Sequence, residues 1–373
     1  MIDNVLIVGG GIGGLCLAVA LRDRGIAVEI VEVKKDWTVY GVGIIQQSNV
    51  VRAMAQLGLV DRYLAASFPF ENVGIYNAVD GQRLALIPGK RLAGPEYPAN
   101  LGIARPALHD VLTTAAVEKG ARVRLGVSVD AIEQSSDCVN VKFTDGTEGA
   151  YGLLVGADGI YSKVRQMIFG DGHQPRFTGQ SAWRHNFARR PEIDHLAAFN
   201  GRDGSAGLVP LSQSLMYMYL TSSEPGNPRM PAQDLHSLMR KRLEPFGGLI
   251  GELRETITNP ANVVYKPMEV IFMPDPWFKG RAVLIGDAAH CTTPHLGQGA
   301  GMAIEDAIVL AEELSAGGTV EDQLSRFMKR RFERCEYIVR SSESVGEMQM
   351  SGAKPGSEMA KVQEMLEVTA RPI

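Results

Sequence analysis

A strand, a glycine-rich turn and a helix follow one another at the start of this chain, and they restrict its fold more than any other feature. Residues 5–8 (VLIV) form the apolar, β-branched run typical of a buried parallel strand. Gly9, Gly11 and Gly14 then form a G-x-G-x-x-G pattern, and residues 15–24 have the apolar spacing of a helix. This order predicts a βαβ unit whose first turn lets the backbone approach a ligand closely.

A second predicted strand, residues 27–31, ends at Glu32. Backbone N–H groups at a helix start favour a pyrophosphate, and an acid at the second strand end accepts the hydroxyls of an adenosine ribose. Because an acid there disfavours a 2′-phosphate, the unit is predicted to bind FAD or NAD rather than NADP. A glycine-rich turn of an unrelated α/β unit is the alternative. The predicted cofactor contacts come from the turn and the strand end: Gly9, Gly11, Ile12, Gly13, Gly14, Glu32 and Val33.

Composition excludes several other classes of protein. A length of 373 residues predicts two domains, and the net charge of −4 gives no basic field for nucleic acid or anionic lipid. The four cysteines are far apart, so neither a disulfide framework nor a cysteine zinc site is expected, and no metal is predicted. We expect a cytoplasmic protein, monomeric or homodimeric, without nucleic-acid partners or stable membrane association.

Two later segments each contain a predicted strand that ends in a turn with glycine and aspartate. Residues 153–159 (LLVGADG) lead to Ser162 and Arg165, and residues 281–290 (RAVLIGDAAH) lead through 294–301 (PHLGQGAG) into a predicted helix. A second strand-GxGxxG-helix unit is absent, which disfavours an enzyme with two dinucleotide-binding domains.

Together, the three motifs resemble the fingerprints of the single-component flavoprotein aromatic hydroxylases, the para-hydroxybenzoate hydroxylase-like group. The resemblance covers about residues 1–340. Within this group, the chain most resembles the salicylate, 6-hydroxynicotinate and FAD-dependent urate hydroxylases. It implies FAD as cofactor, with NADH or NADPH as transient co-substrate. It also implies that Asp287 bonds the ribityl chain and that the loop from residue 294 lies against the isoalloxazine. The further cofactor contacts implied are Arg105, Asp158, Arg165, Asp287, Pro294, Gly297, Gln298, Gly299 and Ala300.

The resemblance further implies an activity: NAD(P)H- and O2-dependent hydroxylation of an electron-rich aromatic or N-heteroaromatic ring through a flavin C4a-hydroperoxide. A small aromatic or heteroaromatic compound and O2 are therefore the expected partners. Two alternatives stay open, a flavin oxidase or dehydrogenase on the same fold, and a non-catalytic FAD-fold binding protein.

The predicted fold class is α/β, with a Rossmann-like FAD-binding domain, an inserted β-rich (α+β) substrate domain and a C-terminal helical segment. Residues 139–144 alternate and meet an Asp-Gly hairpin signal, and residues 207–211 and 215–220 are further strand candidates. The predicted boundaries are 1–70, 101–170 and 274–335 for the FAD domain, 71–100 and 171–273 for the substrate domain, and 336–373 for the tail.

Three residues are predicted to act on the substrate. His295 lies in the flavin loop, and a histidine can accept a proton near neutral pH; a structural role behind the substrate is the alternative. Tyr217 shares a strand face with Tyr219, for which ordinary sheet packing is the alternative. Gln47 falls in a loop expected near the flavin, with a solvated turn as its alternative.

Other polar residues are predicted to be structural or solvated. His290 is expected to be structural, with no carboxylate partner evident for a metal site. Arg184, Arg189 and Arg190 are expected to be solvated, with contact to a nicotinamide cofactor phosphate or a substrate carboxylate as the alternative. The predicted helix from about residue 320 carries an expected solvated basic face of Lys329, Arg330, Arg331 and Arg334.

Overall fold

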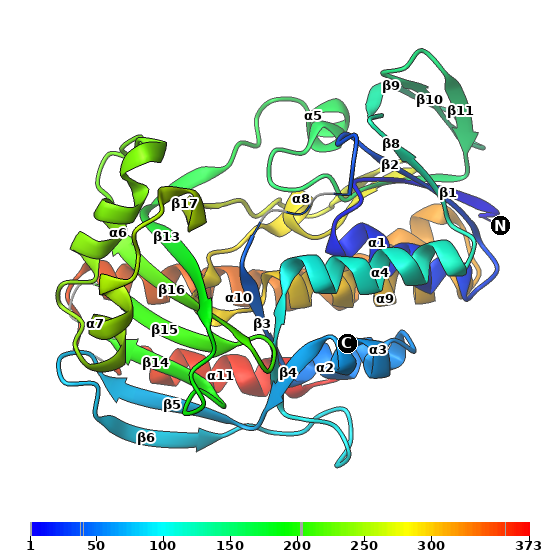
Figure 1. The fold of residues 1–373 in the computed structure, drawn as a ribbon. Helices are drawn as coiled ribbons and strands as arrows, with labels where there is room; N and C mark the ends of the chain where they lie inside the picture. Colours follow the sequence, from blue (N-terminus) through cyan, green and yellow to red (C-terminus); the bar gives the residue numbers. More distant parts are fainter. Residues whose placement is uncertain (1, 38, 40, 202–203, 355) are drawn as a thin grey trace.

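The computed structural model describes residues 2–37, 39, 41–201, 204–354 and 356–373 (Figure 1). The helices of this part of the chain are α1 (Ile12–Arg22), α2 (Ser48–Gln56), α3 (Val60–Ala65), α4 (Arg105–Glu118), α5 (Lys163–Phe169), α6 (Leu235–Arg242), α7 (Gly248–Glu255), α8 (Asp287–His290), α9 (Gly299–Ser315), α10 (Val320–Met350) and α11 (Met359–Ala370). Three 3-10 turns add η1 (Ala232–Asp234), η2 (Pro260–Asn262) and η3 (Pro294–Leu296).

A parallel sheet forms the first layer. Its strands are, in order, β18 (Phe278–Lys279), β19 (Ala282–Leu284), β12 (Leu153–Gly156), β1 (Asn4–Val8), β2 (Ala27–Glu32) and β8 (Arg122–Leu125). Every pairing is parallel except that of β18 with β19. Helix α1 packs between this sheet, α4 and α9. The predicted βαβ unit and the two later strands are therefore confirmed, and the ends of β1, β12 and β19 meet at one edge.

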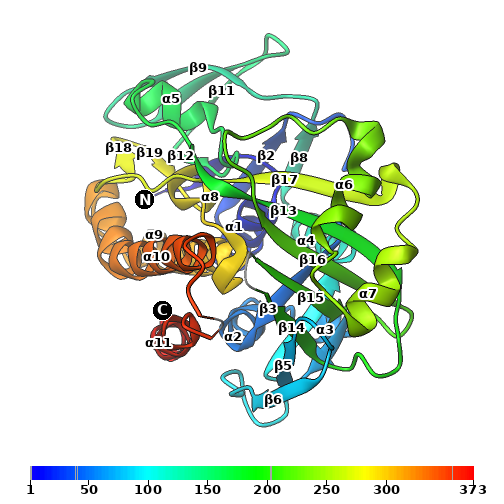
Figure 2. The ribbon, with the colours of Figure 1, turned by 90° about the vertical axis from the view of Figure 1, so that its left-hand side faces the viewer.

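A second large sheet forms the other half of the molecule. Its order is β17 (Val263–Val270), β13 (Arg176–Ala188), β16 (Leu215–Ser223), β15 (Ser205–Pro210), β14 (Leu196–Asn200), β5 (Asn72–Asn77) and β6 (Arg83–Pro88). All its strands lie within the predicted substrate-domain segments. Helices α6 and α7 cover the outer face, where Met216, Met218 and Leu220 of β16 are buried (Figure 2).

Two smaller sheets complete the architecture. One contains β11 (Glu148–Tyr151), β10 (Val139–Phe143) and β9 (Val129–Gln134), and it includes the predicted Asp-Gly hairpin. The other contains β3 (Gly43–Gln47), β7 (Asn100–Ala104) and β4 (Ser67–Phe70), and it packs against the inner face of the seven-stranded sheet. A Cβ built on Gly102 would lie 2.0 Å from the Pro210 carbonyl oxygen, so only glycine permits this approach.

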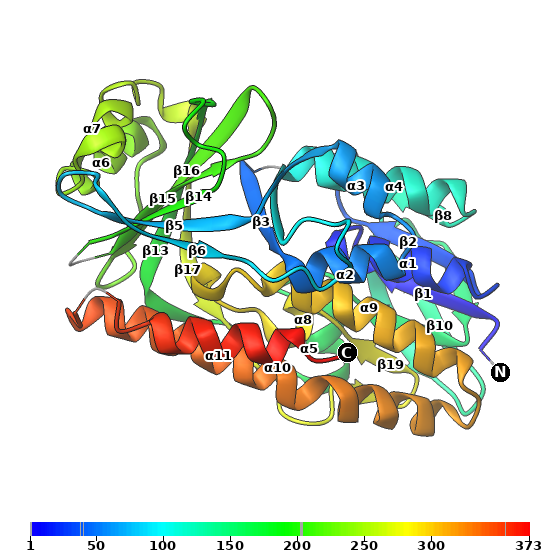
Figure 3. The ribbon, with the colours of Figure 1, turned by 90° about the horizontal axis from the view of Figure 1, so that it is seen from below.

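Helix α10 runs from the parallel sheet to the seven-stranded sheet (Figures 1 and 3). It begins at a capping box in which Thr319 and Asp322 each bond the other's backbone N–H group. The predicted tail boundary at residue 336 lies inside this single helix, because its apolar face stays buried on both sides of that point. No described helix is both long and apolar enough to cross a lipid bilayer.

The prediction that the basic face of α10 is solvated is wrong for two of its residues. Arg331 is 0% exposed, and its guanidinium bonds Asp306 (Nε–Oδ1 2.8 Å) and Glu305 (Nη1–Oε2 2.8 Å) of α9. Arg334 also bonds Glu305, through Nε at 2.8 Å and Nη2 at 2.7 Å. Burial would raise the pKa of Asp306, but His290 and Arg331 lower it to about 2. The two charged rows meet because α9 and α10 pack side by side, which a single helix's pattern does not reveal.

We expect Arg331→Met to lower the free energy of unfolding of the apoprotein by about 3–5 kcal/mol, since two carboxylates would stay buried without their cation. Urea denaturation measures this loss. Arg340→Met is the matched control, because the Arg340 side chain on the same helix is 62% exposed and exposed ion pairs contribute little. Similar small losses for both variants would contradict a stabilising role of the Arg331 pairs.

Candidate active site

The glycine turn after β1 has the geometry of an anion cradle. Gly9 has φ +113°, and a Cβ built there would lie 2.3 Å from the Ala157 carbonyl oxygen; one on Gly14 would lie 2.1 Å from the Gly9 carbonyl oxygen. Gly11, by contrast, has no described atom within 4 Å of its built Cβ. It is the N-cap of α1, which has no side-chain cap and no acid in its first turn. The helix start therefore faces open space, as a pyrophosphate would require.

The neighbouring predicted residues divide between ligand and packing roles. Glu32 accepts hydrogen bonds from the N–H groups of Gly10 (2.9 Å) and Lys34 (3.0 Å), which hold its carboxylate beside the turn. The Cβ position of Gly13 lies 3.2 Å from the Ala303 Cβ, so Gly13 lets α1 approach α9. Ile12 begins α1, and Val33 is 67% exposed just after β2. Direct cofactor contacts of these residues stay predictions.

Asp158 and Arg165 brace the turn that follows β12. The Asp158 carboxylate accepts from Ser162 Oγ (2.5 Å) and from the N–H groups of Lys163 (2.8 Å) and Val164 (3.1 Å), so it caps α5. Arg165 is fully buried and donates to the carbonyl oxygens of Ile160 (2.7 Å) and Ala288 (2.9 Å). These bonds explain both residue types structurally and tie this turn to the Gly286-Asp287 turn; their predicted contact with FAD stays a prediction.

Asp287 and Arg105 lie near each other beyond the strand ends of the parallel sheet. The Asp287 side chain is exposed at the start of α8. Burial raises the pKa of Asp287, while His290 and Arg105 lower it. Arg105 begins α4, and its side chain packs against Gly41, whose φ is +141°. A polar acceptor and a cation thus stand together where the resemblance expects the flavin.

The loop after α8 has little regular structure, and Gln47 helps to hold it. Gly297 has φ +66°, a left-handed position that favours glycine. Gln298 is the N-cap of α9, but its side chain does not cap that helix; it bonds Gln47 and Asn49 instead. Gln47 Nε2 donates to the Leu296 carbonyl oxygen at 3.2 Å. Pro294 begins η3, and Gly299 and Ala300 form the uncapped first turn of α9, which has no acidic side chain.

His295 is partly buried against protein. Its Nδ1 lies 2.9 Å from Thr293 Oγ1, its Nε2 is buried without a hydrogen-bond partner, and its ring packs against Gly346 of α10. Burial lowers the pKa of His295 to about 4, so the imidazole is neutral at pH 7. This environment suits a packing role better than proton transfer, and the predicted catalytic role stays untested.

Tyr217 and Tyr219 lie on the inner face of the seven-stranded sheet with Arg184. Arg184 of β13 is directly opposite Tyr219 of β16 in the antiparallel register, which puts both side chains on one face. A Cβ on Gly43 would lie 2.4 Å from the Tyr217 ring, so β3 closes over it. Burial raises the pKa of Tyr217 to about 12, which keeps its phenol neutral.

The expectation that Arg184 is solvated is wrong. Burial and the nearby Arg105 lower the pKa of its guanidinium, and among the described residues no carboxylate pairs with it. Arg189 is also partly enclosed, stacking 4.8 Å from the Phe68 ring, whereas Arg190 is exposed as predicted. The sequence signal for Arg184 was weak, because its place beside Tyr219 depends on strand pairing.

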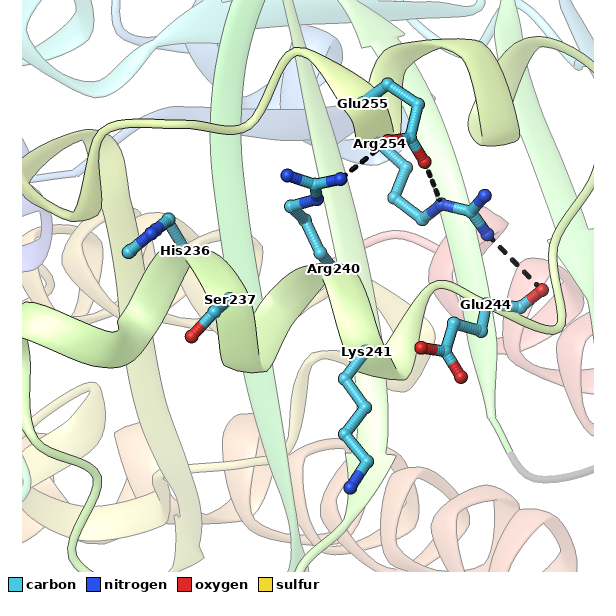
Figure 4. A pocket seen from close by; sticks show the side chains of 7 residues that line it. All are labelled: His236, Ser237, Arg240, Lys241, Glu244, Arg254 and Glu255. Atoms are coloured by element: carbon cyan, nitrogen blue, oxygen red, sulfur yellow. Dashed lines mark hydrogen bonds and ion pairs between the residues drawn. The ribbon is translucent and has the colours of Figure 1, made fainter.

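Two other polar clusters do not fit the active site. His290 lies 2.6 Å from Asp306, so the predicted lack of a carboxylate partner is wrong, and Cys335 is close by. Because Arg331 already bonds Asp306, a metal cation there would meet a guanidinium. A surface hollow of about 340 Å³ between α6 and α7 is lined by internally paired charges such as Arg240–Glu255 and Arg254–Glu255 (Figure 4).

Comparisons with known proteins agree with this geometry. The model of the FAD binding domain family matches residues 3–342. The 2-heptyl-3-hydroxy-4(1H)-quinolone synthase of Pseudomonas aeruginosa is 33% identical over 350 residues, covering 92% of this chain and 89% of that protein. Aurachin C monooxygenase/isomerase of Stigmatella aurantiaca is 32% identical over 349 residues, with the same coverages of 92% and 89%.

A crystal structure of Klebsiella pneumoniae HpxO complexed with FAD and uric acid has the same fold, with a TM-score of 0.85 and 24% identity over 98% of this chain and 92% of that chain. The fold and the glycine turn define a flavoenzyme with a single dinucleotide-binding unit. The chain belongs to the FAD binding domain family, and it is an FAD-dependent monooxygenase. The predicted resemblance, enzyme class and cofactor are confirmed.

Because Gly11 alone in the turn faces open space, we expect Gly11→Ala to leave the stability of the apoprotein unchanged and to weaken FAD binding about tenfold or more. Titration of apoprotein with FAD, followed by flavin fluorescence, measures this effect. Gly172→Ala is the control, since its added Cβ also meets open space, far along the chain from the cradle. Equal FAD affinity in the two variants would contradict the pyrophosphate assignment.

The buried state of His295 predicts a pH dependence of stability. An unfolded histidine titrates near 6.5, whereas the pKa of His295 in the folded protein is about 4. The unfolded chain therefore binds more protons between these values, and this contribution to stability is full above about pH 6.5 and lost as the pH falls. We expect His295→Asn to flatten the dependence by up to about 1.4 kcal/mol per pH unit in that window. Urea unfolding at several pH values tests this, and an unchanged slope would show that His295 titrates normally.

Proposed function

We propose that this enzyme uses NAD(P)H and O2 to hydroxylate a small aromatic or N-heteroaromatic ring that carries an acidic group, a hydroxyl or a carboxylate. The observation that carries the proposal is the partly buried Arg184 on the inner face of the seven-stranded sheet, without a protein carboxylate among the described residues. A cation that is partly removed from water without a counter-ion is costly, and an anionic ligand would offset that cost.

The surroundings of Arg184 support an aromatic ligand. Tyr217 and Tyr219 stand beside it with ring centroids 6.3 Å apart, and aromatic faces favour stacking or edge contacts with another ring. Arg105 adds a second cation, with Asp287 as the nearby acid. Positions between a sheet of one domain and the strand ends of another commonly hold small ligands.

Bound FAD, once reduced by NAD(P)H, supplies the chemistry that transfers one oxygen atom of O2 to the ring. The protein's own groups then orient the ring and govern its charge. Arg184 would stabilise the deprotonated hydroxyl, which makes the ring electron-rich. Tyr217 is a neutral phenol and would donate a hydrogen bond rather than accept the proton. NADH and NADPH are held inside cells, which supports the predicted cytoplasmic location.

Substrate-stimulated oxidation of NADH and NADPH tests the function over hydroxybenzoates, hydroxypyridines and purines. Incorporation of one atom from labelled O2 into the product identifies a monooxygenase. Substrate oxidation without label would favour the flavin oxidase or dehydrogenase alternative. NAD(P)H oxidation unaffected by every aromatic compound would favour a non-catalytic FAD-fold protein.

Arg184→Met should separate acidic from neutral substrates. We expect KM for an acidic ring to rise roughly tenfold to hundredfold, since hydrogen bonds to charged groups contribute roughly 1.5–3 kcal/mol. KM for a neutral analogue and the FAD dissociation constant should change little. Arg190→Met is the control, because Arg190 is 49% exposed and lies just beyond the same strand. An equal loss for acidic and neutral rings would contradict the charge recognition.

A further inference from the structure

A buried chain of side-chain hydrogen bonds joins the 294–300 loop to α9. Asn49 of α2 is 1% exposed, and its Nδ2 donates to Gln298 Oε1 and to Glu305 Oε1, both at 3.0 Å. Gln298 Nε2 returns a bond to Asn49 Oδ1 at 3.1 Å. Asn49 therefore connects Gln298, the N-cap of α9, to Glu305, almost two turns further along the same helix.

At the end nearest the 294–300 loop, this series of hydrogen bonds depends on Gln47. Gln298 Nε2 also donates to Gln47 Oε1, and Gln47 Nε2 donates to the Leu296 carbonyl oxygen at 3.2 Å. Because the loop before α9 has no regular structure other than the short turn η3, these side-chain bonds help to define its position. Because these bonds occupy the Gln298 side chain, it does not accept a hydrogen bond from the N–H groups at the start of α9.

The other end of this series of hydrogen bonds, at Glu305, is held by arginines and the C-terminal helix. Glu305 accepts from Arg331 and from Nε and Nη2 of Arg334. Arg334 Nη1 donates to the Val368 carbonyl oxygen at 2.6 Å, near the end of α11. Met365 of α11 is fully buried and packs in one cluster with Leu296 of the loop and Val345 of α10.

We propose that Asn49 is a positioning residue for FAD. It holds the 294–300 loop and the uncapped start of α9 in place for the isoalloxazine by tying Gln298 to the anchored Glu305. In this scheme Gln47, predicted as catalytic, is the last link of the same chain. The inference rests on FAD as the cofactor and is independent of the proposed substrate.

Asn49→Leu tests the proposal, because leucine has nearly the same size but can form none of the three bonds. We expect the FAD dissociation constant to rise about tenfold. In the apoprotein, amide hydrogen exchange should speed up in peptides that cover residues 294–301. The visible circular dichroism of the bound flavin should also change, since the ring would meet a displaced loop.

Gln323→Leu is the matched control. Gln323 is likewise buried and loses one bond to the Leu314 carbonyl oxygen, but at the far end of α9. It should lower the thermal stability of the apoprotein without changing FAD affinity or exchange in the loop. If Asn49→Leu resembles this control in all three measurements, Asn49 is merely structural and the proposal fails.

Gln47→Met provides a second variant at a less buried position, should Asn49→Leu not fold. Weakened FAD binding with faster loop exchange would support the chain of bonds. Reduced turnover with unchanged FAD affinity and unchanged exchange would instead assign Gln47 a catalytic role and overturn the proposal. Failure of the substrate screen would leave these FAD measurements unaffected, so the two proposals can fail separately.

Discussion

The pairing of Arg331 with Asp306 and Glu305 is the interaction on which the rest of the site depends. It buries one cation against two anions between α9 and α10, where an unpaired charge would be costly. Asp306 also accepts the Gly286 N–H at 2.9 Å and contacts His290, so the same carboxylate holds the turn that carries Asp287. Glu305 reaches the 294–300 loop through Asn49. One guanidinium thus sets the relative positions of both loops that follow β19.

Glycines perform the complementary task of bringing backbone segments together. Gly14 and Gly9 allow β1 to turn directly into α1, and Gly102 allows β7 to touch the seven-stranded sheet. Gly11 differs, since the space beside it is left open by protein. The distinction separates glycines that serve packing from one that serves a ligand. Composition alone, with 41 glycines, does not separate them.

The candidate site between the two large sheets depends both on the fold and on particular residues. Strand ends of the parallel sheet supply Asp287 and the glycine turn, while the inner face of the other sheet supplies Arg184 and Tyr217. Helix α10 contacts both halves and helps to fix their relative position (Figure 3). The site therefore exists only where the two halves meet.

The sequence by itself determined the local units: the βαβ turn, the strands that end in Gly-Asp, the hairpin at Asp145, and the FAD-binding family. These depend on short-range periodicity and backbone geometry, which neighbouring residues specify. Only the tertiary structure decided which polar side chains are buried and with whom. Arg331 and Arg184 look like ordinary surface arginines in the sequence, and His295 looks like a proton carrier. Their roles depend on partners more than twenty residues away along the chain, such as Asp306 and Gly346, because burial and charge pairing are properties of packed elements.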